Sequence, residues 1–351
     1  MEKLGCPASL PQFQKFFPDD ARCAKYLEAM KWPEGFVCPT CGHQEEPYRF
    51  VTRSSVVLRC RACRKNASLT AGTIMQSSHT PLTTWFWGAY LMTTQTPGIS
   101  STQFQRQLGL SSRQTSFTLL HKLRSCMVRP DRDKIGSEHT VEIDECYVGG
   151  VTRGEGSGVH HMTMVIGAVE VCTKKPRKDD AERKKVKNKR KNGKTQAEKI
   201  ETYAGRLRLQ VIPDHCMDIL TAFVKDNIAP KATILSDGWQ GYNELLDLGY
   251  KHKPLVLAGD SKKANEHLPM IHRAFSNLKT WILGTHHGRV EPQHLQAYLN
   301  EYVFRFNRRF HPMSGFNSIL GLAAKSVSPT YQELYSGAWE HPGRCPNIDF
   351  S

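Results

Sequence analysis

Two pairs of cysteines constrain the fold of this chain more than any other feature of its sequence. Cys38 and Cys41 form one C-x-x-C pair, Cys60 and Cys63 form another, and 18 residues lie between the pairs. Each pair lets a tight turn aim two thiolates at one ion, and two such turns complete a tetrahedron that leaves no position open for a substrate. The spacing therefore predicts a structural zinc ribbon, against the alternative of four unpaired cysteines at a coincidental spacing.

The chain also carries an excess of positive charge, which favours a polyanionic partner over a small-molecule substrate. Lysine and arginine outnumber aspartate and glutamate by 48 to 33 over 351 residues, a formal net charge of +15. Twelve basic and three acidic residues lie between residues 174 and 194, and this insertion is predicted to be a solvated or nonspecifically DNA-binding loop. Basic residues around the cysteine pairs suit either phosphate contact or a solvated face: Arg49, Arg53, Arg59, Arg61, Arg64 and Lys65.

Nothing in the sequence indicates a membrane span or a secreted protein. No run approaches the roughly 18 apolar residues that a span needs, and the first residues lack the basic-then-apolar order of a signal peptide. We therefore expect an intracellular, reducing compartment. The cysteines outside the two pairs are interpreted as ordinary buried thiols: Cys6, Cys23, Cys126, Cys146, Cys172, Cys216 and Cys345.

Helical periodicity dominates the first third of the chain. Residues 11–33 have apolar residues at helical spacing and end at Trp32-Pro33, which predicts one short helix before the first cysteine pair. Three further helices are predicted over 82–94, 100–109 and 111–127. Serines precede the later two helices as caps, and a turn containing Gly109 separates them, which is typical of a helix-turn-helix.

The predicted helix-turn-helix carries side chains that can reach base edges in a major groove. Amides, hydroxyls and basic groups lie on or near its second helix, and this set favours DNA binding over a simple helical linker whose glutamines face water. The candidate DNA-binding residues are Gln103, Gln107, Arg113, Gln114 and Lys122, with Ser112 and Thr115 beside them.

From about residue 138 the pattern changes to strands. Strands are predicted over 141–150, 161–172 and 206–213, a helix over 215–228, and a fourth strand over 232–238. A short apolar run at 253–259 and two long helices at 267–283 and 291–309 complete the series. Three strands, then helix, strand, helix, strand and helix, is the order expected of a ribonuclease-H-like α/β sheet.

Two aspartates lie on the first and fourth strands of that sheet. Asp144 lies inside the first strand, where an acidic residue is costly unless it serves a purpose, and Asp237 ends the fourth strand. The first and fourth strands are neighbours in a ribonuclease-H-like sheet, so the two carboxylates would converge and hold divalent metal ions. Either aspartate alone would be unremarkable, because Asp237-Gly238 is also an ordinary turn.

Four blocks of the sequence resemble the successive blocks of one enzyme family. In chain order they are VEIDECYVGG, SDGWQGY, IHRAFSNLKTWILGTHHG and HLQAYLNEYVFRFNRR. They are similar to bacterial insertion-sequence transposases that join an N-terminal zinc ribbon to an ISXO-type DDE domain, and eukaryotic elements of the Merlin type share the catalytic blocks. The resemblance runs from the ribbon to about Arg309. It implies structural Zn²⁺, catalytic Mg²⁺ or Mn²⁺, and DNA strand transfer.

The sequence departs from the family pattern at the third catalytic position. Many members have a glutamate there, whereas this chain has His272, followed seven residues later by the Lys279 that completes the pattern. Seven residues is close to two helical turns, so the two side chains would share one helix face. The resemblance implies that His272 supports the metal site and that Lys279 contacts a phosphate. The alternatives are a surface histidine, another acid such as Glu266 as the third ligand, or a catalytically dead copy.

These observations predict four segments. A helix and zinc ribbon occupy 1–72, a helix-turn-helix domain 73–132, a catalytic domain with the basic insertion 133–325, and a C-terminal tail 326–351. We expect a transposase that binds the terminal inverted repeats of its element, cleaves DNA strands and transfers them. The alternatives are a non-enzymatic zinc-ribbon and helix-turn-helix regulator and, more weakly, a structure-selective nuclease.

The predicted reaction also indicates partners and location. Double-stranded DNA is the expected partner, both as transposon ends and as target. Two ends must be handled together, which favours a homo-oligomer on DNA, and no membrane is involved. The expected location is the cytoplasm at the bacterial nucleoid, or the nucleus if the element is eukaryotic.

Overall fold

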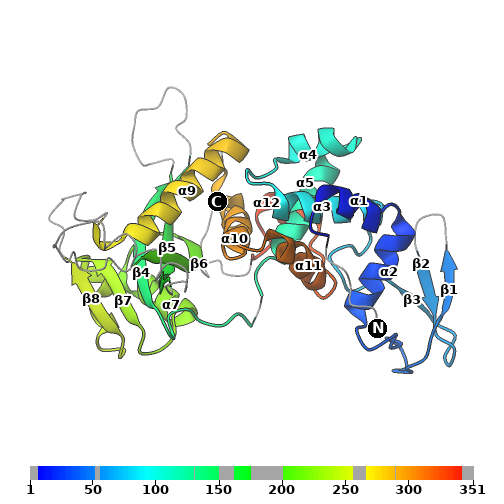
Figure 1. The fold of residues 1–351 in the computed structure, drawn as a ribbon, viewed down its shortest axis with the longest axis horizontal. Helices are drawn as coiled ribbons and strands as arrows, with labels where there is room; N and C mark the ends of the chain where they lie inside the picture. Colours follow the sequence, from blue (N-terminus) through cyan, green and yellow to red (C-terminus); the bar gives the residue numbers. More distant parts are fainter. Residues whose placement is uncertain are drawn as a thin grey trace, which may run out of the picture. The chain divides into compact units, whose positions relative to one another are not determined.

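The computed structural model describes residues 7–51, 56–129, 131–149, 162–174, 201–255, 266–288 and 290–341. The chain divides into two compact units (Figure 1). Unit 1 comprises residues 1–132, 147–163 and 278–351, and unit 2 comprises residues 133–146 and 164–277. This division differs from the predicted boundaries, because the C-terminal residues group with the N-terminal part and not with the catalytic sheet.

Unit 1 is built mainly of helices around an aromatic core. Phe316, near the C-terminus, packs its ring 5.6 Å from that of Phe13 and 5.6 Å from that of Phe17, and Phe86 lies 4.9 Å from Phe17. Residues distant in sequence therefore share one core. Besides the second half of a helix shared with unit 2, the helices described in this unit are α1 (Leu10–Phe16), α2 (Asp20–Lys31), α3 (Leu82–Thr94), α4 (Ser101–Leu108), α5 (Arg113–Ser125), α10 (Pro292–Phe306), α11 (Pro312–Ala323) and α12 (Tyr331–Ser336).

The N-terminal helix predicted over 11–33 is two helices, so that prediction is wrong. Pro18 interrupts the run between α1 and α2, since proline disfavours a helical conformation in the residue before it. Asp19 then caps α2, accepting a hydrogen bond from the backbone N–H of Arg22 at 2.8 Å. The helical spacing of apolar residues continues across the break, which is why periodicity alone did not reveal it.

A small antiparallel sheet forms the zinc ribbon. Its strands are β1 (Tyr48–Val51), β2 (Val56–Arg59) and β3 (Asn66–Ser68), in that order. Leu58 and Ala67 are paired across β2 and β3, and both are buried in a small cluster with Phe36. The cluster also contains two of the zinc-ligand candidates, so the apolar packing and the cysteines support each other.

The three helices predicted between residues 82 and 127 are present, with the predicted caps. Ser100 accepts a hydrogen bond from Gln103 N–H at 3.2 Å, and Ser112 accepts one from Gln114 N–H at 3.2 Å. Gly109 ends α4 in a left-handed conformation with φ of +61°. α5 is exposed only in its first turn, because α3, α4, α10 and α12 pack along the rest of it.

The C-terminal segment contains more structure than predicted. α12 falls within the expected tail and begins with a capping box, in which Thr330 accepts from Glu333 N–H at 3.2 Å and the Glu333 carboxylate accepts from Thr330 N–H at 2.6 Å. Residues 342–351 lie outside the described part of the chain.

Unit 2 contains a five-stranded sheet of the predicted class. Its order is β6-β5-β4-β7-β8, with β5 antiparallel to β6 and with β7 parallel to both β4 and β8. The first and fourth strands of the domain are therefore neighbours, and the ribonuclease-H-like α/β fold is confirmed. The strands are β4 (Thr140–Val148), β5 (Thr163–Thr173), β6 (Thr202–Ile212), β7 (Thr233–Asp237) and β8 (Lys251–Leu255).

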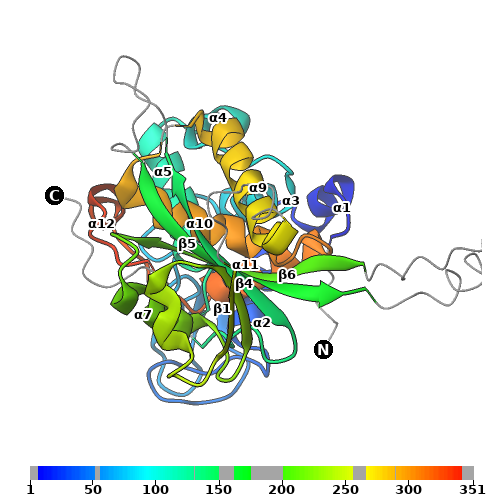
Figure 2. The same ribbon diagram turned by 90° about the vertical axis from the view of Figure 1, so that its left-hand side faces the viewer.

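Two helices cover opposite faces of this sheet (Figure 2). α7 (Met217–Asn227) buries Leu220 and Phe223 against Ile143 and Ile166. The first half of α9 (Pro269–His286) lies on the other face, where a Cβ at Gly167 would come within 2.7 Å of the Phe275 ring. A short 3-10 helix, η2 (Gln240–Leu245), follows β7. Alternate residues of β4 thus face α7 and α9.

Two sequence features fall largely outside the described residues. Of the basic insertion, only Lys174 is described, and its N–H donates to Glu201 O at 2.9 Å where β5 and β6 meet. The glycine-rich stretch after β4 is described only to Gly149. Among the described helices, none combines the length and apolar character that crossing a membrane requires.

The interpretation of the scattered cysteines as buried thiols is right for Cys23, Cys126 and Cys172. It is wrong for Cys216, which is exposed immediately before α7, and Cys146 on β4 is partly exposed. Cys6 and Cys345 lie outside the described residues.

Candidate catalytic and zinc sites

The four cysteines of the ribbon converge as a metal site. The sulfurs of Cys38 and Cys63 are 3.6 Å apart, those of Cys41 and Cys60 are 3.7 Å apart, and all four lie within 4.8 Å of one another. Tetrahedral zinc with Zn–S bonds of about 2.3 Å requires sulfurs about 3.8 Å apart. The four-cysteine cluster therefore fits a structural zinc ion, as the spacing predicted.

Two equivalent turns present these sulfurs. Gly42 N–H donates to Cys38 O at 2.9 Å in the first turn, and Arg64 N–H donates to Cys60 O at 3.1 Å in the second. Gly42 and Arg64 hold the same left-handed conformation, with φ of +71° and +54°. Backbone N–H groups of Cys41 and Thr40 lower the pKa of Cys38, which favours the thiolate that binds metal.

The ribbon presents arginines stacked on exposed aromatic rings. The Arg61 guanidinium lies 4.5 Å from the Tyr48 ring and that of Arg59 lies 5.1 Å from the Phe50 ring. Arg49 instead pairs with Glu28 at 2.6 Å and with a second glutamate, so its charge is partly neutralised. Arg53 lies outside the described residues.

The first aspartate contacts the histidine that the sequence singled out. Asp144 lies on β4, and its side chain is directed toward α9, because Ile143 beside it faces α7. His272 Nε2 lies 3.0 Å from Asp144 Oδ2. This hydrogen bond raises the pKa of His272, although partial burial opposes the shift.

The second aspartate lies at the end of the neighbouring parallel strand. The β4–β7 register pairs Val141 with Ile234, and continuing it along both strands sets Asp144 opposite Asp237. Burial raises the pKa of Asp237, and the negative charge of Asp144 raises it further, while Trp239 N–H donates to Asp237 Oδ1 at 3.1 Å. The structure thus brings together two carboxylates that repel each other.

A buried glutamate that the sequence did not reveal connects the strand to α9. Glu142 is 2% exposed, and its Oε2 accepts hydrogen bonds from Met270 N–H at 2.7 Å and Ile271 N–H at 2.9 Å. It therefore caps the first turn of α9. Because His272 is the next residue of that helix, Glu142 fixes where His272 meets Asp144. The only sequence signal was an acid two residues before Asp144, on the same face of the strand.

A second acid near the aspartates was also missed. Glu145 follows Asp144 on β4, and its carboxylate accepts a hydrogen bond from the buried Tyr242 hydroxyl. Burial, together with the charges of Asp144 and Asp237, raises the pKa of Glu145 to about 7, although the Tyr242 bond opposes the shift. Since Tyr242 belongs to η2, this contact ties the loop after Asp237 to β4.

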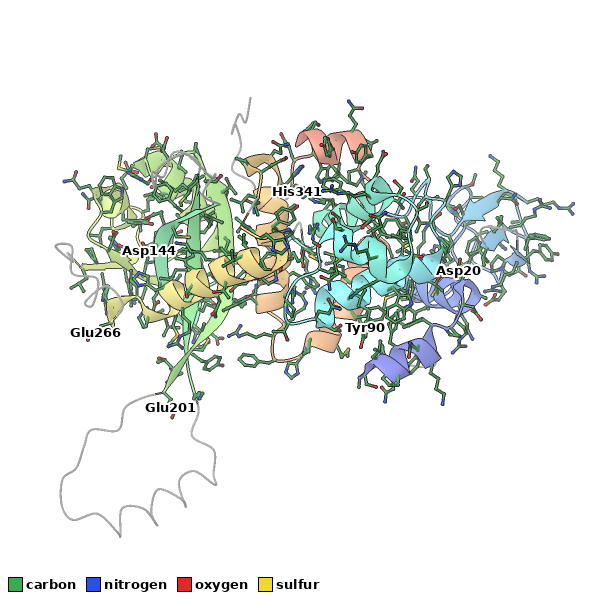
Figure 3. All side chains as sticks on the ribbon, turned by 90° about the horizontal axis from the view of Figure 1, so that it is seen from above. Asp20, Tyr90, Asp144, Glu201, Glu266 and His341 are labelled. Carbon is green, nitrogen blue, oxygen red and sulfur yellow. The ribbon has the colours of Figure 1, made fainter. Side chains whose placement is uncertain are left out.

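The remaining predicted catalytic residue, Lys279, is exposed on α9 seven residues after His272. It lies in the half of the helix that belongs to unit 1. Glu266, the alternative third acid, is exposed at the periphery, apart from Asp144 (Figure 3).

The predicted DNA-contact residues divide into two groups. Gln103, Gln107, Arg113 and Gln114 are exposed on α4 and the first turn of α5. Lys122 is buried, and its Nζ donates to Ser328 Oγ at 2.7 Å. Burial also lowers the pKa of Lys122. Its amine is thus occupied within the protein, and a direct DNA contact does not fit this position.

A ribonuclease-H-like sheet with aspartates on adjacent strands, carried on one chain with a zinc ribbon, defines the class of DDE-type transposases. Comparisons with known proteins agree. An ISXO2-like transposase domain matches residues 137–307, and a transposase zinc-ribbon domain matches residues 18–66. The chain therefore belongs to the insertion-sequence transposases with an N-terminal zinc ribbon and an ISXO-type domain.

One curated relative is similar over most of its length. It is described as an uncharacterized protein in transposable element ISH50 of Halobacterium salinarum. The two are 22% identical over 303 residues, which cover 83% of this chain and 92% of that protein. No solved structure matches.

Proposed function

We propose that this transposase binds the terminal inverted repeats of its element and catalyses DNA strand cleavage and strand transfer at Asp144 and Asp237. The observation that carries the proposal is the parallel pairing of β4 with β7, whose register sets the two carboxylates opposite each other. Membership of the transposase family supports the same chemistry.

The two aspartates suit a hard divalent cation. Carboxylate oxygens are ligands that Mg²⁺ and Mn²⁺ accept, and a cation between the two carboxylates would offset the burial and the repulsion from Asp144 that raise the pKa of Asp237. The imidazole of His272 suits Mn²⁺ better than Mg²⁺. When bound, such ions activate a water or a 3′ hydroxyl for attack on phosphorus and stabilise the leaving oxygen.

The protein's own groups prepare this site. His272 holds Asp144 Oδ2 in place, and Glu142 positions His272 through the first turn of α9. Tyr242 and Glu145 hold the loop that carries Asp237. In this proposal Lys279 contacts a DNA phosphate, and the exposed polar residues of α4 and α5 contact the transposon ends. Two ends are joined together by an oligomer on the DNA.

Strand transfer in vitro tests the proposal. Purified protein is mixed with labelled element ends, a plasmid target and Mg²⁺ or Mn²⁺. Asp144→Asn and Asp237→Asn should each slow joining about a thousandfold or more. Each variant loses several kcal/mol of the stabilisation that the metal ions give to the transition state. Asp226→Asn, an exposed aspartate on α7, is the matched control and should join normally.

Two further results would decide between the remaining functions. His272→Ala should reduce joining more in Mn²⁺ than in Mg²⁺ if the imidazole is a ligand. Tight binding to the ends without joining in either metal would contradict the proposal and favour a regulator or an inactive copy.

A further inference from the structure

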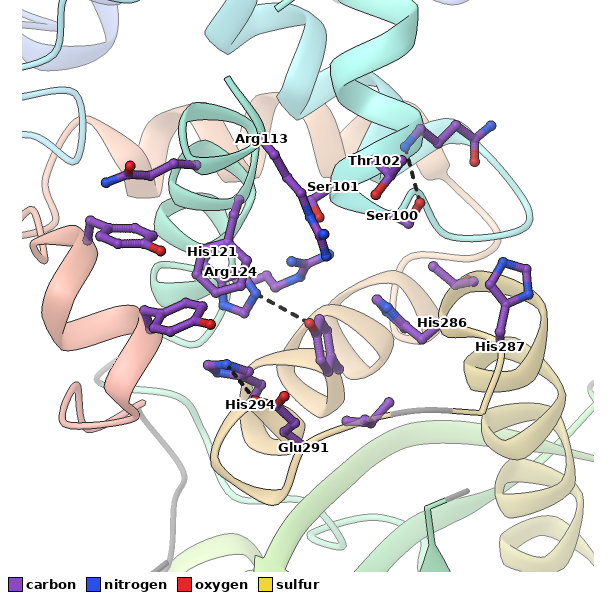
Figure 4. A pocket seen from close by; sticks show the side chains of 18 of the residues that line it. Ser100, Ser101, Thr102, Arg113, His121, Arg124, His286, His287, Glu291 and His294 are labelled. Atoms are coloured by element: carbon purple, nitrogen blue, oxygen red, sulfur yellow. Dashed lines mark hydrogen bonds and ion pairs between the residues drawn. The ribbon is translucent and has the colours of Figure 1, made fainter. Parts of the chain in front are cut away.

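A cavity of about 900 Å³ lies within unit 1 (Figure 4). Its walls are α4 from its N-cap to Arg106, the α5 helix, the C-terminal end of α9, the first half of α10, and α12. Cavities of this size suit small organic ligands, whose volumes fall within the usual range of protein binding pockets. The catalytic carboxylates are not among the lining residues.

The rim of this cavity is positively charged. Outside the buried Arg124–Glu301 pair, its charged lining residues are Arg106, Arg113 and Glu291, which gives 2 − 1 = +1 with neutral histidines. The first turn of α4 also lines it, and the free N–H groups of a helix N-terminus favour anions. Arg113 begins α5, and Figure 4 shows its side chain directed into the cavity. The rim therefore suits a phosphate.

The inner end of the cavity contains polar atoms that lack partners. Arg124 Nη2 and His121 Nδ1 are buried and have no hydrogen-bond partner among the described residues. Arg124 is 2% exposed, and its Nε is paired with Glu301 Oε2 at 2.8 Å, which leaves Nη2 for an additional acceptor. Unpartnered buried polar groups are costly, so a ligand that supplies acceptors would satisfy them.

Aromatic rings line the same cavity. The Phe117 ring stacks on His121 at 4.0 Å, and the Tyr331 and Tyr335 rings stack on each other at 5.4 Å. Phe117 and Tyr335 meet edge to face, with ring centroids 5.8 Å apart and ring planes inclined by 69°, so the two pairs adjoin each other. Aromatic faces bind nucleic-acid bases irrespective of sequence, and arginines bind the phosphates between them.

We propose that this cavity receives one unpaired nucleotide of the bound DNA, with its phosphate at Arg113 and its base against Phe117 and Tyr335. The inference rests on the proposed function, in which α4 and α5 contact the transposon ends. Arg113 and Gln114 belong both to the exposed DNA-contact set and to the cavity lining, so a strand held by the first turn of α5 passes the opening. Extruding a base costs least where it is already mispaired.

The test compares DNA ends that differ by one mismatch. Fluorescein-labelled duplexes of the element end, each with a single mismatch at a different position, are titrated with the full-length zinc-loaded protein, and anisotropy gives Kd. One mismatch position should bind about tenfold more tightly than the perfect duplex, since a base that is already unpaired leaves the duplex at little cost and gains stacking on an aromatic side chain. Tyr335 is exposed, so Tyr335→Ala should fold normally and lose this preference, whereas Tyr335→Phe should retain it.

Photocrosslinking then locates the nucleotide. With 5-iododeoxyuridine at the preferred position, the crosslinked peptide should contain residues of α5 or α12. Binding of perfect duplex with no preferred mismatch, or crosslinks only outside the cavity, would overturn this inference and leave the proposed function intact. Saturable binding of free dAMP without any mismatch preference would assign the cavity to a free nucleotide and also overturn it. Failure to bind any DNA end would instead reject the proposed function.

Discussion

All four cysteines of the zinc ribbon fall within residues 38–63, whereas Asp144, Asp237 and His272 come from β4, β7 and α9. Two short turns with the same backbone conformation are enough to assemble the first site. The second site exists only when a parallel strand pair forms and a helix docks beside it. Removing one cysteine should therefore unfold the ribbon, whereas removing one aspartate should leave the sheet of the catalytic site folded.

The largest expected effect comes from breaking the ribbon with Cys60→Ser. Structural zinc contributes on the order of 10 kcal/mol of apparent folding free energy, so losing one thiolate should release the ion and expose the β1–β3 amides. A colorimetric chelator measures the zinc, and hydrogen exchange measures the amides. Cys23→Ser is the control, since Cys23 is buried but is not a ligand. Equal zinc loss in both variants would contradict the local character of the site.

Glu142→Gln tests the catalytic site, because it changes a residue that positions α9 without changing a candidate metal ligand. The charged acceptor at the first turn of α9 would be replaced by a neutral one, at a cost of about 2 kcal/mol in the free energy of unfolding. Joining should also slow, since His272 loses its fixed position. Urea unfolding measures the first effect, with the exposed Glu138→Gln as a control. Unchanged stability would mean that Glu142 does not hold the helix.

This contrast explains what the sequence could predict. The cysteine spacing was sufficient for the ribbon because the ligands are local, and the order of strands was sufficient to place Asp144 beside Asp237. Glu142 and Tyr242 were missed because their partners, Met270 N–H and Glu145, become neighbours only in the folded domain. No local pattern distinguishes such residues from surface polar groups.

The helix-turn-helix shows the same limit of prediction from sequence, in this case for a residue that was predicted to be functional. Its helices and caps were predicted correctly, but Lys122 was expected to face DNA. In the structure, α10 and α12 cover that part of α5, and Ser328 accepts the hydrogen bond from the Lys122 amine. The grouping of residues 278–351 with the N-terminal core likewise depends on long-range packing of rings such as Phe316 against Phe13.

Acid should weaken unit 1 through histidines that burial keeps neutral. Burial lowers the pKa of His286 to about 3, and the nearby Arg124 charge contributes. The unfolded chain binds this proton near pH 6.5, so stability is lost as the pH falls below about 6.5, by about 1.4 kcal/mol at pH 5.5 for one such group. His286→Gln should reduce the loss measured between pH 7.5 and 5.5 by that amount.

Comparing His286→Gln with the wild-type protein also separates the effect of His286 on stability from the effect of zinc release. Both proteins keep all four cysteines, so zinc release on acidification is common to them and cancels in the difference. Identical pH dependence of unfolding in the two proteins would show that His286 is not neutral in the folded state.

Glu170 in unit 2 should respond at lower pH. Burial alone would raise the pKa of Glu170, but hydrogen bonds from Arg206 and from Gly136 N–H lower it to about 2. Its contribution is therefore complete above the unfolded value of about 4.3 and is lost as the pH falls toward 2. Hydrogen exchange of β5 and β6 between pH 6 and 4.5 should change little, and early loss of protection there would contradict the assigned ion pair.

The smallest effect on stability concerns the backbone of the second cysteine turn, which Arg64 N–H closes onto Cys60 O. Arg64 holds a left-handed conformation that the equivalent Gly42 adopts without strain, and its side chain is exposed. Arg64→Gly should therefore stabilise the ribbon by about 1 kcal/mol relative to Arg64→Ala, which removes the same charge but keeps the strain. Zinc affinity measured by chelator competition gives the difference. If the Arg64→Gly and Arg64→Ala variants bind zinc equally, the local backbone does not set the stability of the ribbon. The ribbon then depends on tertiary packing, as the carboxylate site does.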